Sequence, residues 1–199
     1  MKKLILTFFL IFISTGLKSK IIDCRVVIES AEKKYKIPNK LLLAISLTES
    51  GRTVNGNFVA WPWSVNVSGE SFYFENKEKT ENFLRKKLSE NNKNIDIGCM
   101  QINYRYHNKS FKDLQSFVDP EQNIDWAANF LRNLFVRHNS WNMAISRYHS
   151  SNPKRMRSYL KKVKKNWDKE RQNKVIFLKA KPLKNSELFY NKYKNKIEN

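Results

Sequence analysis

Several motifs that mark common catalytic and binding sites are missing from this sequence of 199 residues. It has no glycine-rich phosphate loop, no Cys-x-x-Cys pair and no His-Glu-x-x-His motif, so those nucleotide, redox and zinc sites are not indicated. Its histidines are His107, His138 and His149, and their spacing matches no strong metal-binding signature. We therefore expect neither a metal site nor a cofactor. No period of 20–50 residues recurs, which argues against a repeat protein.

The apolar run at the N-terminus is too short to span a bilayer. It covers residues 4–13, about half of the roughly 20 residues that a membrane helix needs. Met1-Lys2-Lys3 precedes the run, and small and polar residues follow it. This pattern is typical of a secretory signal peptide. We expect the signal over residues 1–20 and an exported mature protein.

Acidic residues are scarce relative to basic ones. The chain has 38 Lys and Arg against 18 Asp and Glu, a formal charge of +20. From residue 152 to the end there are 16 basic and 4 acidic residues, so the last quarter carries much of the excess. Such a charge predicts an anionic partner: nucleic acid, a membrane or a cell-wall polymer. Export argues against nucleic acid. The basic tail is either a solvated extension or a segment that holds the protein against an anionic surface.

Cysteine is limited to Cys24 and Cys99. An even count in an exported protein permits one disulfide. The alternative is two separate buried thiols.

The periodicity predicts a mainly α-helical domain. Its expected extent is residues 22–165, followed by a basic extension over 166–199 that is partly helical or disordered. The hydrophobic content of 41% and the five tryptophans are enough for a packed core. One small β-hairpin is expected around Ser68-Gly69. The predicted helices cover residues 24–36, 38–50, 80–90, 120–138 and 141–149 and a last one from 153, with Thr80, Asp119 and Ser140 as caps.

The helix predicted for residues 38–50 places a carboxylate in an unfavourable position. Its leucines and isoleucine occupy most faces, so the helix is expected to be enclosed. Glu49 falls in the last turn, where burial raises a carboxyl pKa and the helix C-terminus disfavours an anion. A carboxylic acid that stays protonated near neutral pH suits a glycosidase general acid. The alternative is a solvent-exposed Glu49 at a frayed helix end.

Four segments occur in an order that resembles a known family. They are Glu49-Ser50-Gly51, Trp61-Pro62-Trp63, residues 98–103 (GCMQIN) and residues 144–149 (AISRYH). In combination they resemble the lytic transglycosylase domain of the soluble (SLT) type, a relative of goose-type lysozyme, over residues 24–160. The resemblance is greatest to small exported transglycosylases, some of which accompany type IV secretion or conjugation machines.

The resemblance implies a lysozyme-like fold and a reaction on peptidoglycan in the periplasm. Such enzymes cleave the β-1,4 bond between N-acetylmuramic acid and N-acetylglucosamine. The muramyl C6 hydroxyl attacks C1, and a 1,6-anhydro ring results. One carboxyl group suffices as acid and then base, which fits the absence of an obvious second partner for Glu49.

The resemblance also implies roles for particular residues. Glu49 matches the acid/base, Tyr148 matches a tyrosine whose hydroxyl orients the acid, and His149 replaces a commoner asparagine, with a weak substrate contact. The expected sugar-site residues are Ser50, which can also hydrogen-bond near the acid, Gly98, Met100, Gln101 and Asn103. Gly98 would let the chain pass close to the sugar.

Several alternatives remain open at this point. Tyr148 and Met100 could be core residues, and Trp61 and Trp63 could be either sugar platforms or core aromatics. Asp96 stands where a serine is common, which allows a second carboxylate and ordinary lysozyme-like hydrolysis. A third reading is a wall-binding, secretion-accessory protein without essential activity.

Overall fold

The structure is a computed structural model, and it describes residues 24–172. The predicted signal peptide and most of the basic extension lie outside these residues. Within them most of the chain is helical, as predicted. The helices are α1 (Cys24–Lys34), α2 (Leu41–Ser50), α3 (Lys77–Ser89), α4 (Tyr104–His107), α5 (Leu114–Val118), α6 (Pro120–His138), α7 (Trp141–His149) and α8 (Pro153–Gln172), with a 3-10 turn, η1 (Asn108–Ser110).

Two antiparallel sheets accompany the helices. The strands are β1 (Gly51–Val54), β2 (Asn57–Ala60), β3 (Ser64–Val67), β4 (Glu70–Tyr73), β5 (Ile95–Ile97) and β6 (Ile102–Asn103). Strands β1 and β2 form a hairpin, and the other four form a sheet in the order β4-β3-β5-β6. The predicted hairpin is confirmed as β3–β4. The expectation of a single hairpin was wrong, since β1 and β2 form a second one. Strands β5 and β6 were also missed, because with three and two residues they show no readable alternation.

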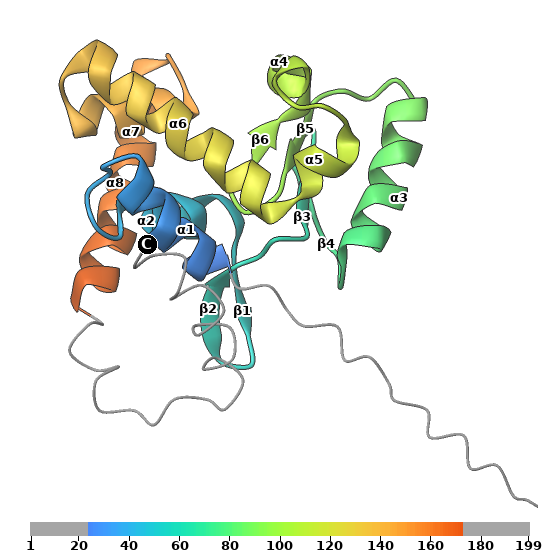
Figure 1. Cartoon of the computed structure of the whole chain (residues 1–199), viewed down its shortest axis with the longest axis horizontal. Helices are drawn as coiled ribbons and strands as arrows, with labels where there is room; N and C mark the ends of the chain where they lie inside the picture. Colours follow the sequence, from blue (N-terminus) through green and yellow to red (C-terminus); the bar gives the residue numbers. More distant parts are fainter. Residues whose placement is uncertain (1–23, 173–199) are drawn as a thin grey trace, which may run out of the picture.

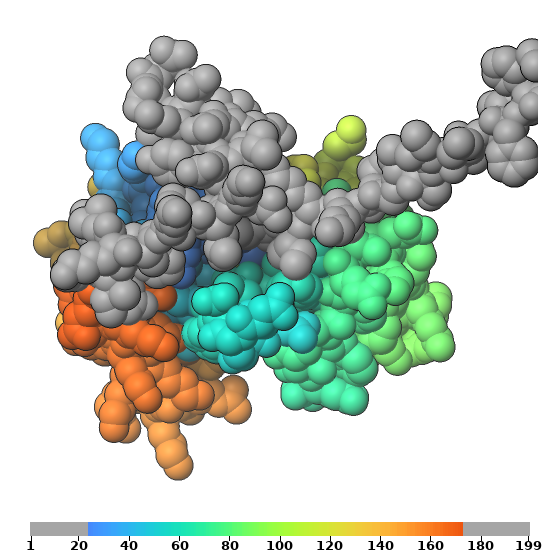
Figure 2. Space-filling model, turned by 90° about the horizontal axis from the view of Figure 1, so that it is seen from below, coloured from blue at the N-terminus to red at the C-terminus, as the bar shows by residue number. Residues whose placement is uncertain are grey.

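The helices and the four-stranded sheet lie on different sides of the molecule. Figure 1 shows α1, α2, α6, α7 and α8 together on one side and the sheet, flanked by α3, α4 and α5, on the other. The β1–β2 hairpin projects beside α2. Figure 2 shows this hairpin (cyan) next to α8 (orange). Glu49, at the end of α2, therefore lies where the helical and sheet parts meet.

Helix α2 is enclosed, as its sequence predicts. Every residue from Leu41 to Leu47 is buried. Helices α1 and α8 and strand β2 pack against it. An all-round apolar helix of this kind gains its stability from burial rather than from amphipathic surface contacts.

Two of the predicted helix caps are confirmed and one is wrong. The Asp119 carboxylate accepts hydrogen bonds from the first turn of α6, and the Ser140 hydroxyl accepts one from Met143 N–H. Helix α3 instead begins at Lys77 with Asn76 as its cap. Thr80 is buried inside that helix, and its hydroxyl donates to the Asn76 carbonyl at 2.9 Å. The backbone of Asn76 is extended, as is usual for an N-cap residue, and its side-chain oxygen accepts a hydrogen bond from Lys79 N–H.

Cys24 and Cys99 are joined by a disulfide. Both residues are fully buried. The bond connects the first residue of α1 to the loop between β5 and β6, across 75 positions of sequence. It therefore ties the helical part of the molecule to the motif at residues 98–103.

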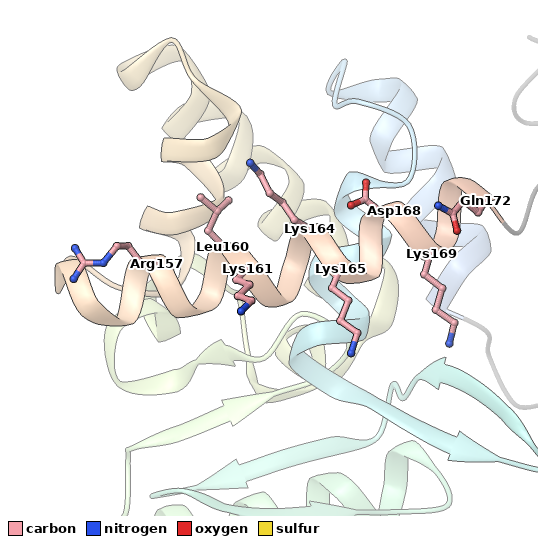
Figure 3. A pocket seen from close by; sticks show the side chains of 8 residues that line it. All are labelled: Arg157, Leu160, Lys161, Lys164, Lys165, Asp168, Lys169 and Gln172. Atoms are coloured by element: carbon pink, nitrogen blue, oxygen red, sulfur yellow. The ribbon is translucent and has the colours of Figure 1, made fainter.

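Helix α8 continues past residue 165, the expected end of the domain, to Gln172. Trp167 donates its indole N–H to the Asn39 carbonyl at 2.9 Å, and the buried Glu170 pairs with Arg25 at 2.7 Å. Its outer face is basic. Figure 3 shows a shallow groove on that face, lined mainly by Arg157, Leu160, Lys161, Lys164, Lys165 and Lys169.

The helices of residues 24–172 are too short or too polar to lie across a membrane.

A buried carboxylate from α1 caps the start of α2. Lys40, at the N-cap position, has a left-handed backbone and no side-chain cap of its own. The Glu32 carboxylate accepts hydrogen bonds from the backbone N–H groups of Lys40 at 2.8 Å and Leu43 at 3.1 Å. Burial nevertheless raises the Glu32 pKa to about 7, and these hydrogen bonds oppose the shift. Glu32 thus satisfies backbone donors that would otherwise be orphaned inside the protein.

We predict that Glu32→Ala lowers the free energy of unfolding by about 1–3 kcal/mol, because it leaves buried N–H groups unpaired. Urea denaturation followed by circular dichroism measures this. Glu29→Ala on the same helix is the matched control, since Glu29 is partly exposed and pairs with the Lys40 side chain; a loss of about 0–1 kcal/mol is expected there. Equal losses for the two variants would contradict the capping role.

Candidate active site

Glu49 lies at the C-terminal end of α2, against α8. Its side chain is surrounded by protein on most sides and keeps partial exposure to solvent. The hydroxyl of Tyr159, from α8, donates to Glu49 Oε1 at 2.5 Å. Tyr159 is itself only 5% exposed. The predicted alternative, a Glu49 that points freely into solvent at a frayed end, is therefore wrong.

The surroundings of Glu49 favour its protonated form. Desolvation is the largest effect and raises the pKa of Glu49 to about 7. The hydrogen bond from Tyr159 and the charge of Lys162 lower the pKa, while the charge of Asp96 raises it. A carboxyl group with such a pKa can give up a proton and take one back near neutral pH.

The tyrosine that contacts Glu49 is not the one expected. We expected Tyr148 to orient the acid, but its hydroxyl donates to the Met100 carbonyl at 3.0 Å. The Glu49 charge still raises the Tyr148 pKa, after desolvation, so Tyr148 lies close to the acid. Tyr148 links α7 to the loop at residues 98–103, called the motif loop below. Tyr159 reaches Glu49 from α8, which packs directly on α2.

The motif at residues 98–103 forms a tight loop held by Asn123 of α6. Gly98 has a φ of +83°, and a Cβ there would lie 2.8 Å from the Asn123 side chain. The Asn123 amide accepts from Met100 N–H and donates to the Ile97 carbonyl. Gly98 is therefore required by the packing of Asn123 as well as by its backbone conformation. The expected role of Gly98 at a sugar site stays a prediction.

The remaining motif side chains are largely committed to the protein. Met100 is fully buried, so it offers no open apolar surface in this structure. Gln101 donates its amide N–H to the carbonyls of Ser64 and Gly98 at 3.2 and 3.0 Å. Asn103 donates to Asp96 at 2.8 Å and caps α4. Their sugar-binding roles stay predictions, and the geometry assigns each of them a structural contact.

Ser50 points into the core rather than toward the Glu49 carboxylate. Its hydroxyl donates to the carbonyls of Cys99 at 2.8 Å and Ser46 at 3.2 Å. Ser46 donates to the same Cys99 carbonyl at 3.0 Å. The two serines therefore fasten the loop at residues 98–103 to the end of α2 that carries Glu49, beside the disulfide.

A row of polar side chains crosses the four-stranded sheet next to this loop. Strand register pairs Ser71 with Asn66, Asn66 with Asp96, and Asp96 with Asn103. Since paired residues share a face of a sheet, these four side chains lie on one face. Asp96 acts on Glu49 electrostatically, so the row leads to the acid. Burial raises the pKa of Asp96, and the hydrogen bond from Asn103 opposes that shift.

The aromatic residues near the site divide into buried and exposed ones. Trp61 and Trp63 are 7% and 6% exposed, so they are core aromatics in this structure. Tyr73, on the edge strand β4, is 44% exposed. His149 lies parallel to the Tyr159 ring, with the ring centroids 4.5 Å apart. Its pKa is lowered, first by desolvation and then by Arg155 and Lys162.

Sequence reasoning missed Tyr159, Asn123, Asn66 and Ser71. Tyr159 and Val163 share the buried face of α8, so the periodicity of that helix contains a signal for a buried tyrosine. Nothing in the periodicity indicates its partner, which is 110 residues away. Within residues 24–172 no group of three or more His, Cys, Asp or Glu side chains is arranged to hold a metal ion.

The site geometry agrees with a family comparison. A family model for the transglycosylase SLT domain matches residues 26–172, about three quarters of the chain. This chain belongs to the SLT transglycosylase family. The family is lysozyme-like in fold, and its activity is of the lytic transglycosylase type, on peptidoglycan. Searches of curated proteins and of solved structures found no match.

The raised pKa of Glu49 has a consequence for stability. Between pH 4.5 and about 7 the unfolded chain has released this proton while the folded protein retains it. Folding stability therefore falls as pH rises through this window, and the cost persists above it. The acid is maintained at the expense of stability at neutral and alkaline pH.

We predict that Glu49→Gln raises the free energy of unfolding at pH 8 by about 1–3 kcal/mol, with no gain below pH 4.5. Urea titrations at pH 4 and pH 8 measure the difference. Glu78→Gln, on the exposed surface of α3, is the control and should stay within about 0.5 kcal/mol at both pH values. A Glu49→Gln protein that is less stable at pH 8 would contradict the desolvation of Glu49.

Proposed function

We propose that this protein is a peptidoglycan lytic transglycosylase that cleaves the bond between N-acetylmuramic acid and N-acetylglucosamine and forms 1,6-anhydro-N-acetylmuramic acid. The observation that carries the proposal is the largely enclosed Glu49 carboxyl, with a pKa of about 7 and a hydrogen bond to Tyr159. Family membership supplies the substrate class.

Glu49 acts as the single acid and base in this proposal. Protonated Glu49 donates its proton to the glycosidic oxygen while the bond to muramyl C1 breaks. The resulting carboxylate takes the proton from the C6 hydroxyl as O6 bonds to C1. The carboxyl is thus restored, and no water is consumed. Tyr159 positions the carboxyl and stabilises its anionic form between the two steps.

Asp96 supports a second candidate, hydrolysis. This carboxylate belongs to the polar row of the sheet and lies close enough for its charge to raise the Glu49 pKa. Two carboxyl groups that flank a glycosidic bond are the usual equipment of hydrolysing glycosidases. In that case Asp96 stabilises the positive sugar or activates water, and the product has a reducing end.

We propose export to the periplasm and association with an anionic surface through the C-terminal part of the chain. The signal-like N-terminus and the basic groove on α8 support this (Figure 3). Service to a type IV secretion or conjugation-type machine is a further part of the proposal and rests on the sequence resemblance.

Product chemistry separates the two reactions. We predict that the chain without its signal segment releases disaccharide-peptides one water lighter than hydrolysis products, without a reducing end. Mass spectrometry of fragments from purified peptidoglycan measures this. Glu49→Gln should lower the release rate by at least about a hundredfold, because the proton donor is lost.

Each other result has a defined meaning. Reducing-end products that disappear in Asp96→Asn would establish hydrolysis. Full activity in Glu49→Gln would refute the assignment of the acid. Binding to peptidoglycan without any release would favour the accessory, wall-binding alternative.

The two tyrosines give a separate test of the site. Loss of the Tyr159 hydroxyl removes a hydrogen bond that lowers the Glu49 pKa. We predict that Tyr159→Phe moves the alkaline limb of the pH–rate profile upward by about one unit and lowers the maximal rate about tenfold. Tyr148→Phe is the matched comparison, because its hydroxyl bonds Met100 instead; its alkaline limb should not move. A shift in Tyr148→Phe alone would restore the role first expected for Tyr148.

A further inference from the structure

Arg52, three residues after Glu49, is held between two aromatic rings. Its guanidinium carbon lies 4.9 Å from the centre of the Trp61 ring and 4.7 Å from the centre of the Tyr73 ring. Trp61 is fixed in turn, since its indole N–H donates to the Phe74 carbonyl at 2.8 Å. The two ring contacts restrain the Arg52 side chain before any ligand binds, so binding costs it less conformational entropy.

Arg52 lies close to Glu49 in sequence but outside the groups whose charges act on that carboxyl. Strand β1 follows α2 directly, so Arg52 is close to the acid along the chain. Tyr73 pairs with Ser64, whose carbonyl accepts hydrogen bonds from Gly98 and Gln101 of the motif loop. The charged groups that act on Glu49 are Asp96 and Lys162, not Arg52.

Arg52 has no anionic partner among the residues that the structure describes. Within residues 24–172 its guanidinium has no ion-pair or hydrogen-bond partner, and its contacts are the two rings. A guanidinium that lies over aromatic rings keeps its N–H donors in its own plane, where a carboxylate binds in bidentate fashion. The site is half-buried, so such a pair would be screened less than one on open surface.

A second cation reaches the same hairpin from α8. Lys169 Nζ lies 5.9 Å from the centre of the Phe58 ring, at the other side of the β1–β2 hairpin. Lys165 and Lys169 lie along one side of α8 in Figure 3, and Figure 2 shows α8 next to the hairpin. Arg52 and the α8 lysines therefore place positive charge at opposite faces of the same hairpin, since Arg52 pairs with Val59 and Phe58 with Thr53.

We propose that Arg52 is the anion-binding residue of a subsite for the carboxylates of the peptide stems that peptidoglycan carries on its muramic acid residues. This inference rests on the proposed function. Where a peptide is attached, the lactyl carboxyl of the muramic acid forms the amide bond to it, so the carboxylates that such a strand offers to Arg52 are those of the stem. Tyr73 supplies the exposed ring beside the bound stem.

The decisive comparison uses two arginines that each lie over a pair of aromatic rings. Arg132 on α6 also lies over two rings, those of Phe135 at 4.9 Å and Trp141 at 6.0 Å, but on the α6–α7 side of the molecule. Arg52→Gln and Arg132→Gln therefore remove the same charge and the same type of contact. Arg52→Lys keeps the charge and loses the planar fork. Thermal unfolding of each variant verifies that it is folded.

Binding is measured in a Glu49→Gln background, by co-sedimentation with insoluble peptidoglycan. In this background the Arg52→Gln protein is expected to need about a tenfold higher peptidoglycan concentration for half-saturation than the Arg132→Gln protein. Arg52→Lys should retain part of the lost affinity, because it keeps the charge. On peptidoglycan whose free carboxylates have been converted to amides, the difference between the two Gln variants should disappear. In the active protein Arg52→Gln should raise the half-saturating concentration much more than it lowers the maximal rate.

Equal binding by the Arg52→Gln and Arg132→Gln proteins overturns the inference. So does a difference that persists on the amidated polymer, because Arg52 would then act on something other than carboxylates. If the unsubstituted protein releases no fragments but the two variants differ in binding, the proposed function fails while the carboxylate subsite stands. If release occurs and the variants bind alike, the subsite alone is refuted.

Discussion

The hydrogen bond between Tyr159 and Glu49 joins the two helices on which the site depends. It connects residues 110 positions apart, and it lies where α8 packs along α2. A carboxyl group in such a place resists ionisation because the protein replaces most of its water. The single phenolic donor offsets part of that cost. The acid thus stays near the midpoint of its titration at neutral pH, where transfer in either direction is accessible.

A carboxyl group whose pKa is raised by burial lies at each end of α2, one from α1 and one from α2 itself. Glu32 lies against its first turn and Glu49 in its last, and burial raises the pKa of both to about 7. At the first turn the backbone N–H groups bind the carboxylate, so the local chemistry favours it. At the last turn no such donors are present, and a tyrosine from α8 takes their place. The apolar surface of α2 provides the stability that lets both carboxylates remain.

The motif loop connects α1, α2 and α6, and it is also a candidate sugar site. The Cys99 carbonyl accepts two serine hydroxyls from α2, its sulfur is bonded to α1, and Asn123 of α6 fills the space above Gly98. These contacts fix the polar row of the sheet relative to Glu49. Precise placement of this kind is what glycosyl transfer requires, since a reacting group displaced by about 1 Å costs much of the rate.

The sequence by itself determined the long helices, one hairpin and the candidate acid. Local sequence patterns predicted the enclosed α2 with Glu49 at its end, the caps Asp119 and Ser140, and the β3–β4 hairpin. Each of these features depends on residues that are near one another in the sequence. The short strands β5 and β6 were not predictable, because two or three residues carry no period. The fold class followed because long helices with buried stripes dominate the chain.

Only the tertiary structure decided which side chains meet. Ser50 and Met100 read as sugar contacts in the sequence, yet one is hydrogen-bonded to the core and the other is fully enclosed. The sequence pointed to Tyr148 as the partner of Glu49 through the family resemblance and did not indicate Tyr159, which the packing of α8 on α2 brings to the carboxyl. The ionisation of Glu49 and the contacts of Arg52 with the Trp61 and Tyr73 rings likewise depend on surroundings built from other segments of the chain. Periodicity fixes the direction of a side chain relative to its own helix or strand, but the neighbours it meets depend on how those elements pack.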